Sequence, residues 1–167
     1  MKNRVLVTGG TGFIGSHICD ALIELGNEVV CFDNQITSSK ENIEHLEKRE
    51  GFHFVKGDIR DLDSVEVAME GCTHVCHQAA LGSVPRSIDD PIRSTEINLI
   101  GGLNLLCSSN SLGVKRFVFA SSSSVYGDDS QLPKVESRVG NPLSPYAASK
   151  ASFEDYARVF FLIHGME

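Results

Sequence analysis

The feature that most constrains this chain is a glycine-rich turn between a strand-like segment and a helix-like segment. Residues 3–8, Asn-Arg-Val-Leu-Val-Thr, run into Gly9-Gly10-Thr11-Gly12-Phe13-Ile14-Gly15, and a helical pattern follows directly. In this order Gly9 allows a tight turn, Gly12 lets the backbone approach a pyrophosphate, and Gly15 lets the new helix pack against the strand. The amino-terminal end of that helix presents free N–H groups and a positive dipole to the anion. The turn therefore predicts a dinucleotide-binding site.

An acidic residue at the right distance supports this interpretation. A glycine fingerprint alone is a weak signal, and the alternative is a purely structural turn. Asp33 closes the next strand-like segment, at the expected spacing of roughly twenty residues. A carboxylate there accepts a hydrogen bond from a ribose 2′-hydroxyl and repels a 2′-phosphate, and no Arg or Lys follows before Lys40. We therefore expect NAD, rather than NADP, as the cofactor.

Alternating strand and helix patterns predict the architecture. Strands are expected at 3–8, 28–33, 52–55, 73–77 and 116–120, and helices near 13–25, 40–49, 62–70, 91–111 and 144–164. Residues 78–90 are expected to form a loop. Such alternation is typical of βαβ units, so we predict an α/β fold with a doubly wound parallel sheet. The length of 167 residues suits one domain.

Composition argues against several classes of function. The formal net charge of −7 is unfavourable for electrostatic binding of nucleic acid. No segment reaches the length of a membrane-spanning helix, and no signal-peptide pattern precedes the first strand. We therefore expect a cytoplasmic protein with no membrane or nucleic-acid partner.

The cysteines raise the question of a metal site. Five cysteines are scattered along the chain, which favours reduced thiols over a disulfide framework. In the stretch 72–77, Cys72, His74 and Cys76 would share one face of a strand and His77 would lie on the other. No second ligand pair follows at zinc-site spacing. We interpret the stretch as a strand with small buried thiols and expect no metal.

Two segments in the second half have the residue types needed for chemistry on a hydroxyl group. Tyr146 and Lys150 are four residues apart, on one face of a helix, and the lysine charge favours the phenolate. A tuned phenol suits acid/base work beside a hydride acceptor; the alternative is a solvated helix face. Ser121-Ser122-Ser123-Ser124 follows a strand at its carboxyl end, where doubly wound sheets bind ligands. The alternative there is a flexible polar loop.

Together these motifs resemble a known family. The glycine turn, the serine run that ends in Val125-Tyr126-Gly127, and Ser144-Pro145-Tyr146-Ala147-Ala148-Ser149-Lys150 are similar to the extended short-chain dehydrogenases/reductases. Within that family the chain resembles the nucleotide-sugar 4-epimerases. Residues 77–87, His-Gln-Ala-Ala-Leu-Gly-Ser-Val-Pro-Arg-Ser, and residues 132–136, Leu-Pro-Lys-Val-Glu, are most similar to the UDP-N-acetylglucosamine 4-epimerase group. The resemblance covers essentially all of the chain and implies a Rossmann fold.

The resemblance also implies roles for particular residues. Ser122, Tyr146 and Lys150 match the catalytic set. Cofactor contacts are implied for Gly9, Gly12, Phe13, Ile14, Gly15, Asp33, Asn34, Asp58, Ile59, Gln78, Ala79, Ala80, Asn98, Tyr146 and Lys150. Substrate contacts are implied for Ser83, Val84, Arg86, Ser122, Ser123 and Tyr146.

The implied activity is NAD-dependent C4 epimerisation of a UDP-hexose through a transient 4-keto sugar, with UDP-N-acetylglucosamine and UDP-N-acetylgalactosamine as the expected pair. Related dehydratases have Thr-Asp-Glu before Val-Tyr-Gly, where this chain has Ser122-Ser123-Ser124. One alternative is another enzyme of the extended family, a reductase or decarboxylase. The other is a non-catalytic NAD-binding fragment.

The resemblance further implies features beyond a single site. Family members continue into a smaller domain that grips the nucleotide half of the substrate, so residues 1–167 are expected to be an NAD-binding domain without the sixth strand and without that domain. A homodimer is implied through the helices near 91–111 and 144–164. Apolar residues in the first helix exceed what one sheet-facing stripe needs: Ile97, Leu99, Ile100, Leu103, Leu105 and Leu106. The alternative is a helix that is simply well buried.

Overall fold

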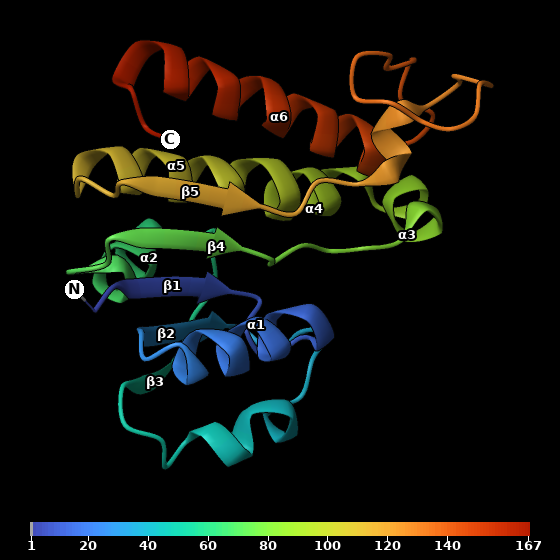
Figure 1. The fold of residues 1–167 in the computed structure, drawn as a ribbon. Helices are drawn as coiled ribbons and strands as arrows, with labels where there is room; N and C mark the ends of the chain where they lie inside the picture. Colours follow the sequence, from blue (N-terminus) through green and yellow to red (C-terminus); the bar gives the residue numbers. More distant parts are fainter. Residues whose placement is uncertain (1) are drawn as a thin grey trace.

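A computed structural model describes residues 2–167 as a five-stranded parallel sheet with helices on both faces (Figure 1). The spatial order of the strands is β3-β2-β1-β4-β5. Their bounds are Arg4–Thr8 for β1, Glu28–Asp33 for β2, Phe52–Lys56 for β3, His74–His77 for β4 and Arg116–Phe119 for β5. Every neighbouring pair is parallel, so the predicted doubly wound α/β fold is confirmed.

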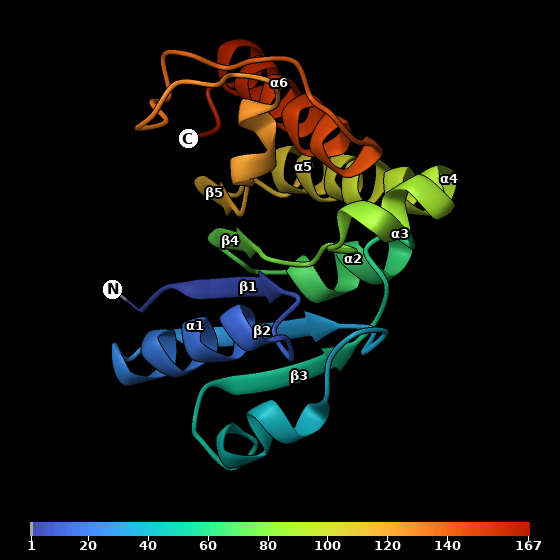
Figure 2. The ribbon, with the colours of Figure 1, turned by 90° about the vertical axis from the view of Figure 1, so that its right-hand side faces the viewer.

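Strand alternation divides the core into two layers. Val5 and Val7 of β1 face helix α1 (Phe13–Glu24) and the 3₁₀ helix η1 (Lys40–Leu46). Leu6 faces the opposite way, toward α2 (Leu62–Met69) and α5 (Gly101–Ser111). Because the sheet is covered on both sides, β1 and β2 have continuous apolar runs, Val5–Val7 and Val29–Phe32, rather than alternately polar residues. Figure 2 shows α1 and α2 on either side of the strands.

The long carboxyl-terminal helix forms a smaller third cluster. Helix α6 (Pro145–His164) packs against α5 and β5, with Phe153 buried between Leu106 and the two phenylalanines of β5. In Figure 1 it lies along α5, over the β5 edge of the sheet. This packing places its first turns beside the carboxyl end of β5.

The segment 78–111 differs from its prediction in two ways. A short helix, α3 (Val84–Asp89), stands inside the expected loop. The expected helix over 91–111 consists of α4 (Pro91–Thr95), a π-helical turn η2 (Glu96–Ile100) and α5. Helix α3 has only six residues, too few to show a helical repeat in the sequence. The π-helical turn is a single turn inside a longer helix, so it has no periodic pattern of its own.

The serine-rich stretch after β5 also has regular structure. Residues Ser123–Tyr126 form a 3₁₀ helix, η3, where a polar loop is the sequence-based alternative. Ser122 precedes it in extended conformation and caps it with its hydroxyl. The stretch is therefore an ordered element at the strand end.

Three sequence-based questions concern thiols, metals and membranes. All five cysteines are free, and Cys19, Cys31 and Cys72 are buried. Burial raises the pKa of the Cys72 and Cys76 thiols above the usual range. Within residues 2–167 no group of three His, Cys, Asp or Glu side chains is arranged to hold a metal ion. None of the helices in that range combines the length and hydropathy of a membrane crossing.

Candidate active site

The glycine turn connects β1 to α1 with a geometry that other residues would disturb. Gly9 has a φ of +68°, and a Cβ on it would lie 2.6 Å from the backbone nitrogen of Ala79. A Cβ on Gly15 would collide with the Gly9 carbonyl oxygen, so Gly15 packs against the turn itself rather than against the strand. The turn is therefore held close to both the new helix and the segment after β4.

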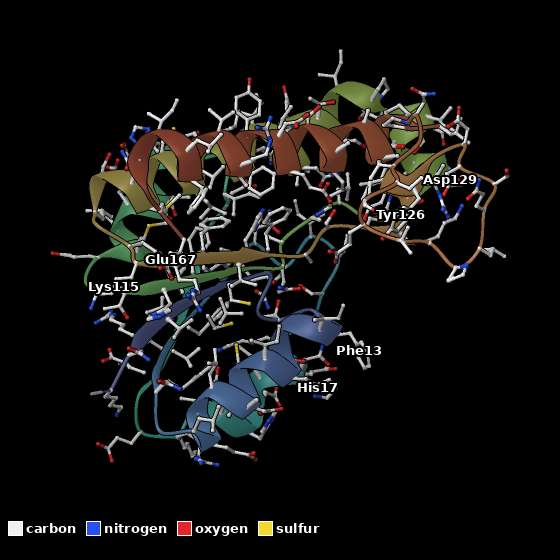
Figure 3. The ribbon with its side chains drawn as sticks, turned by 45° about the horizontal axis from the view of Figure 1, so that its top comes forward. Phe13, His17, Lys115, Tyr126, Asp129 and Glu167 are labelled. Atoms are coloured by element: carbon white, nitrogen blue, oxygen red, sulfur yellow. The ribbon has the colours of Figure 1, made fainter. Side chains whose placement is uncertain are left out.

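Helix α1 begins without a side-chain cap. Gly12 is its N-cap residue, in extended conformation, and no side chain accepts a hydrogen bond from the first turn. The first-turn amides are thus left for an external acceptor, which is the arrangement that binds phosphate. Phe13 and Ile14 are both exposed, and Phe13 stacks edge-on against His17 at a centroid distance of 5.1 Å (Figure 3).

A pocket at the carboxyl ends of the strands collects most of the residues that the sequence predicts for the cofactor. The predicted residues that line it are Gly9, Gly12, Asp33, Asn34, Ile59, Gln78, Ala79 and Ala80. Further lining residues, to which no motif pointed, are Phe32, Ile36, Thr37, Ser38, Gly57, Leu81 and Ile97. The pocket joins the glycine turn to the ends of β2, β3 and β4, which is where doubly wound folds bind nucleotides.

Asp33 is the best-fixed charged group of this pocket. Its carboxylate accepts hydrogen bonds from the backbone nitrogens of Thr11, at 3.1 Å, and Gln35, at 2.7 Å. The Ser38 hydroxyl also donates to it, at 3.2 Å. The side chain is buried at the end of β2. A negative charge held in this way can accept ribose hydroxyls and disfavours a phosphate.

Asp58 lies beside the pocket rather than on its wall. Its carboxylate is bound by Arg60, through Nε at 3.0 Å and Nη2 at 2.8 Å, and by the side-chain amide of Asn34 at 2.9 Å. The Arg60 hydrogen bonds are the main reason that the pKa of Asp58 falls to about 2. Asp58 is therefore ionised, and Arg60 is a neighbour that the motifs did not indicate.

Asn98 lies behind the pocket wall. Its side chain is buried and forms two hydrogen bonds with the backbone of Leu81: Oδ1 accepts from the Leu81 nitrogen at 2.7 Å, and Nδ2 donates to the Leu81 oxygen at 3.2 Å. Leu81, rather than Asn98, lines the pocket. The π-helical turn that contains Asn98 thus anchors the wall, and a direct cofactor contact through Asn98 stays a prediction.

A second buried contact supports the same wall. The Thr8 hydroxyl accepts from the Ala79 nitrogen at 3.3 Å and lies 2.7 Å from His77 Nδ1. Burial, together with the smaller effect of the Lys150 charge, lowers the pKa of His77 to about 3, so the ring is neutral. Thr8 Oγ1 and His77 Nδ1 share one hydrogen bond. The pair therefore ties β4 to β1 next to Ala79.

The predicted catalytic pair lies in the first two turns of α6. Ser144 caps the helix, and its hydroxyl accepts from the Ala147 nitrogen at 3.1 Å. Lys150 is buried, and its Nζ donates to the carbonyl oxygen of Ala120, directly after β5, at 2.9 Å. Burial lowers the pKa of this ammonium to about 8. Tyr146 is half-buried and lies one turn earlier on the same face of α6. Below pH 8 Lys150 is protonated, so its positive charge lies on the face of the helix that contains Tyr146.

The serine run forms a separate hollow beside α6. Ser122 Oγ accepts from the Ser124 nitrogen at 3.2 Å and from the Ser124 hydroxyl at 2.9 Å, while Ser123 is exposed. The Ser121 hydroxyl donates to Glu154 of α6. The hollow is lined by Phe119, Ser121, Ser122, Ser123, Val125, Tyr126, Glu136 and Glu154. Glu154, four residues after Lys150, is a site residue that no motif indicated.

The predicted sugar-facing residues of segment 83–86 are exposed. Ser83, Val84 and Arg86 all lie at the solvent-exposed start of α3, which packs against α6. Ser83 has a φ of +117°, a conformation that non-glycine residues rarely adopt. The Ser83 hydroxyl accepts from the Arg86 nitrogen at 3.3 Å and caps the helix. Strain of this kind is often found at functional sites.

Comparison with known proteins agrees with this geometry. The sequence profile of the NAD dependent epimerase/dehydratase family matches residues 5–166. A putative UDP-glucose 4-epimerase of Methanocaldococcus jannaschii is 42% identical over 165 residues, which are 98% of this chain and 52% of that protein.

Two solved structures are similar over the same range. The UDP-glucose 4-epimerase of Thermus thermophilus in complex with NAD has a TM-score of 0.90 and 45% identity, over 98% of this chain and 52% of that one. The UDP-N-acetylglucosamine 4-epimerase of Methanobrevibacter ruminantium in complex with UDP-N-acetylmuramic acid has a TM-score of 0.93 and 40% identity, over 100% and 53%. This chain spans about half the length of each.

Proposed function

Because this chain belongs to the NAD dependent epimerase/dehydratase family, we propose that it forms the NAD-binding half of an enzyme that interconverts the C4 epimers of a UDP-hexose. The observation that most supports this is the placement of Lys150. Its ammonium is fixed on the carbonyl that follows β5, one helical turn from the Tyr146 phenol. A lysine ammonium beside a tyrosine favours the phenolate, which is the base that the proposed reaction needs.

The residues of the pocket fit NAD. The uncapped first turn of α1 offers amides to the pyrophosphate, and a side chain at Gly9 would crowd the Ala79 backbone on that wall. We assign Asp33 and Asn34 to the adenosine ribose and Asp58 and Ile59 to the adenine; Asp33, Asn34 and Ile59 line the pocket, and Asp58 is bound to Asn34 beside it. When bound, the nicotinamide supplies a reversible hydride acceptor.

Residues of this chain accept and return the proton of the C4 hydroxyl. The Tyr146 phenolate accepts the proton of the C4 hydroxyl as the hydride leaves C4, which gives a 4-keto sugar. The same phenol returns the proton once the hydride has come back to the opposite face. Lys150 favours the ionised form of the phenol, and Ser122 orients the C4 oxygen. Over one reaction cycle the sugar loses one proton and one hydride and then regains both.

The serine run favours epimerisation over dehydration. Water elimination needs an acid and a base beside the sugar, and Ser123 and Ser124 supply neither. Ser124 donates its hydroxyl to Ser122, and Ser123 is exposed. Glu154 lines the same hollow but is engaged by Ser121. We therefore prefer the epimerase to the dehydratase within this family.

For the sugar we propose a UDP-N-acetylhexosamine. The support is the similarity of residues 77–87 and 132–136 to the UDP-N-acetylglucosamine 4-epimerase group, together with the likeness to the Methanobrevibacter structure. The relatives named UDP-glucose 4-epimerase make the unsubstituted hexose the competing substrate. The ratio of kcat/KM for the two sugars distinguishes these substrates.

We also propose a homodimer, but through different side chains from those that the sequence suggested. Of the six apolar residues singled out in 97–106, Ile97, Leu105 and Leu106 are buried in the core and only Ile100 is exposed. Exposed apolar side chains on α4, η2 and α6 form the candidate interface: Ile92, Ile100, Tyr156, Val159 and Ile163. Light scattering at micromolar concentration tests it, and a monomer would contradict it.

The proposed activity is tested with the full-length protein, NAD and each of the two UDP-sugars. Separation of the C4 epimers identifies the expected product, and Tyr146→Phe serves as the inactive control. A 4-keto-6-deoxy product would indicate a dehydratase instead. A protein that binds NAD and UDP-sugar but forms no product would support the non-catalytic alternative. The 167-residue chain alone is expected to bind NAD but to turn over slowly, because remote binding energy normally positions the sugar.

A further inference from the structure

Helix α3 packs on the catalytic helix through a single buried side chain. Of its six residues, Val84–Asp89, only Ser87 is buried, and its exposed fraction is 0%. The Ser87 hydroxyl donates to the Val84 carbonyl at 2.7 Å and accepts from the backbone nitrogen of Tyr146 at 3.1 Å. A packed helix usually buries apolar side chains. A lone buried hydroxyl with both hydrogen bonds made indicates a specific role.

That role is visible in the first turn of α6, where each amide needs a partner. Pro145 has no N–H, so it needs none. The Ala147 and Ala148 nitrogens donate to the hydroxyl and the carbonyl of Ser144, at 3.1 and 2.9 Å. The Tyr146 nitrogen is not reached by this local cap. Ser87 completes the cap from another helix.

The same two turns have a second anchor on the opposite element. Lys150 Nζ donates to the Ala120 carbonyl after β5. The turn that contains Tyr146 is therefore held from α3 through its backbone and from β5 through Lys150. Removal of the first contact leaves the Tyr146 amide without its partner, so the backbone that supports the phenol can shift locally while the rest of α6 stays packed. Catalytic positioning is sensitive to shifts on the order of 1 Å.

We propose that Ser87 is a positioning residue for Tyr146: by capping the Tyr146 amide from α3, it fixes the phenol and joins it to the helix whose exposed start is expected to face the sugar. This rests on the proposed function for its catalytic meaning. Ser83, Val84 and Arg86 lie on the same short helix. A sugar that orders α3 would thus also order Tyr146, through one hydrogen bond.

The chain offers a matched control. Ser94 of α4 is also a buried serine, and its hydroxyl has no hydrogen-bond partner among residues 2–167. Ser87→Ala and Ser94→Ala therefore each remove a hydroxyl oxygen from a similarly buried site, but only Ser87→Ala breaks a hydrogen bond to α6. Both variants are compared with wild type as NAD-bound protein, with NAD affinity as the check on folding.

Three measurements are made on each variant. Amide hydrogen exchange at Tyr146 should accelerate about tenfold or more in Ser87→Ala. The ring signal of Tyr146, followed by NMR of ring-labelled tyrosine, should shift in that variant; the chain has three tyrosines, and Tyr146→Phe assigns the signal. In the full-length protein kcat should fall about tenfold with little change in KM. Ser94→Ala should leave all three within twofold of wild type.

The outcomes separate this inference from the proposed function. Unchanged exchange at Tyr146 in Ser87→Ala would overturn the cap. Faster exchange with an unaltered Tyr146 ring signal and unaltered kcat would show a merely structural contact and would also overturn the inference. If wild type turns over neither UDP-sugar while exchange and the ring signal change only in Ser87→Ala, the proposed function fails and the positioning of Tyr146 by Ser87 stands.

Discussion

The two halves of this sheet hold their site residues in different ways. In the first half, around β1, β2 and α1, the residues lie directly at strand ends, and backbone amides fix the key carboxylate of Asp33. In the second half they lie on short helices and on the first turns of α6, and contacts between distant segments position them. Backbone groups at strand ends thus shape the pocket of the first half, whereas side-chain contacts between helices and strand ends position the predicted catalytic residues of the second.

The largest effect should separate chemistry from cofactor binding. Tyr146→Phe removes the oxygen that accepts the proton and leaves the ring, so kcat should fall about 10²–10⁴-fold in the full-length protein. NAD affinity, measured by titration on the same sample, should change little. Near-normal turnover would remove Tyr146 from the mechanism, and a parallel loss of NAD affinity would show that the two halves are not separable in this way.

A substitution in the glycine turn should destabilise the protein through the first half of the sheet. Gly9→Ala forces a side chain into a positive-φ position whose Cβ would lie 2.6 Å from the Ala79 nitrogen, and the free energy of unfolding should fall by about 2–3 kcal/mol. Gly113→Ala is the matched control, since Gly113 has a φ of +71° and open space around its Cβ position. Its cost should be backbone strain alone, about 1 kcal/mol. Equal losses in the two variants would mean that the close approach to Ala79 is unimportant.

The pH dependence of stability should report on Lys150 in the second half. The folded-state pKa of this group is about 8, below the ordinary value of 10.5. Between those values the unfolded chain binds more protons, so the free energy of unfolding should rise with pH, by up to about 1.4 kcal/mol per unit. Denaturant unfolding of wild type minus Lys150→Met isolates this contribution. A flat difference from pH 8 to 10.5 would mean that Lys150 is better solvated than its burial indicates.

A smaller effect should sharpen the role of Asp33 in the first half. Asp33→Asn keeps the shape and removes the charge, so the ratio of NADP to NAD affinity should rise about tenfold. Asp155→Asn changes the net charge equally on the exposed surface of α6 and should leave the ratio unchanged. Wild type that prefers NADP over NAD would contradict the assignment outright.

The same contrast decides what the sequence could predict. The glycine turn, Asp33 and the five strands were predictable because each leaves a local pattern in the sequence, namely a glycine spacing, an acidic residue at a strand end or a short apolar run. Helix α3, the π-helical turn and the 3₁₀ helix after β5 were not, because a short element has no periodic signal. Asn98 is 17 residues from Leu81 and Ser121 is 33 from Glu154, so no local pattern indicates either contact. The family resemblance led to Ser122 and Tyr146, but it left Ser87, Arg60 and Glu154 unassigned.

The uncapped start of α1 links the folding equilibrium to metabolite concentration. No side chain accepts a hydrogen bond from the first-turn amides of α1, whose N-cap residue is Gly12. An anion bound from outside the chain can accept these hydrogen bonds. A ligand that binds only the folded state adds RT ln(1 + [L]/Kd), about 2.7 kcal/mol at a hundredfold excess over Kd. The melting temperature of this protein should therefore track the NAD concentration of the buffer. Resistance to proteolysis should follow it, so that a fall in cofactor supply shortens the lifetime of the folded chain.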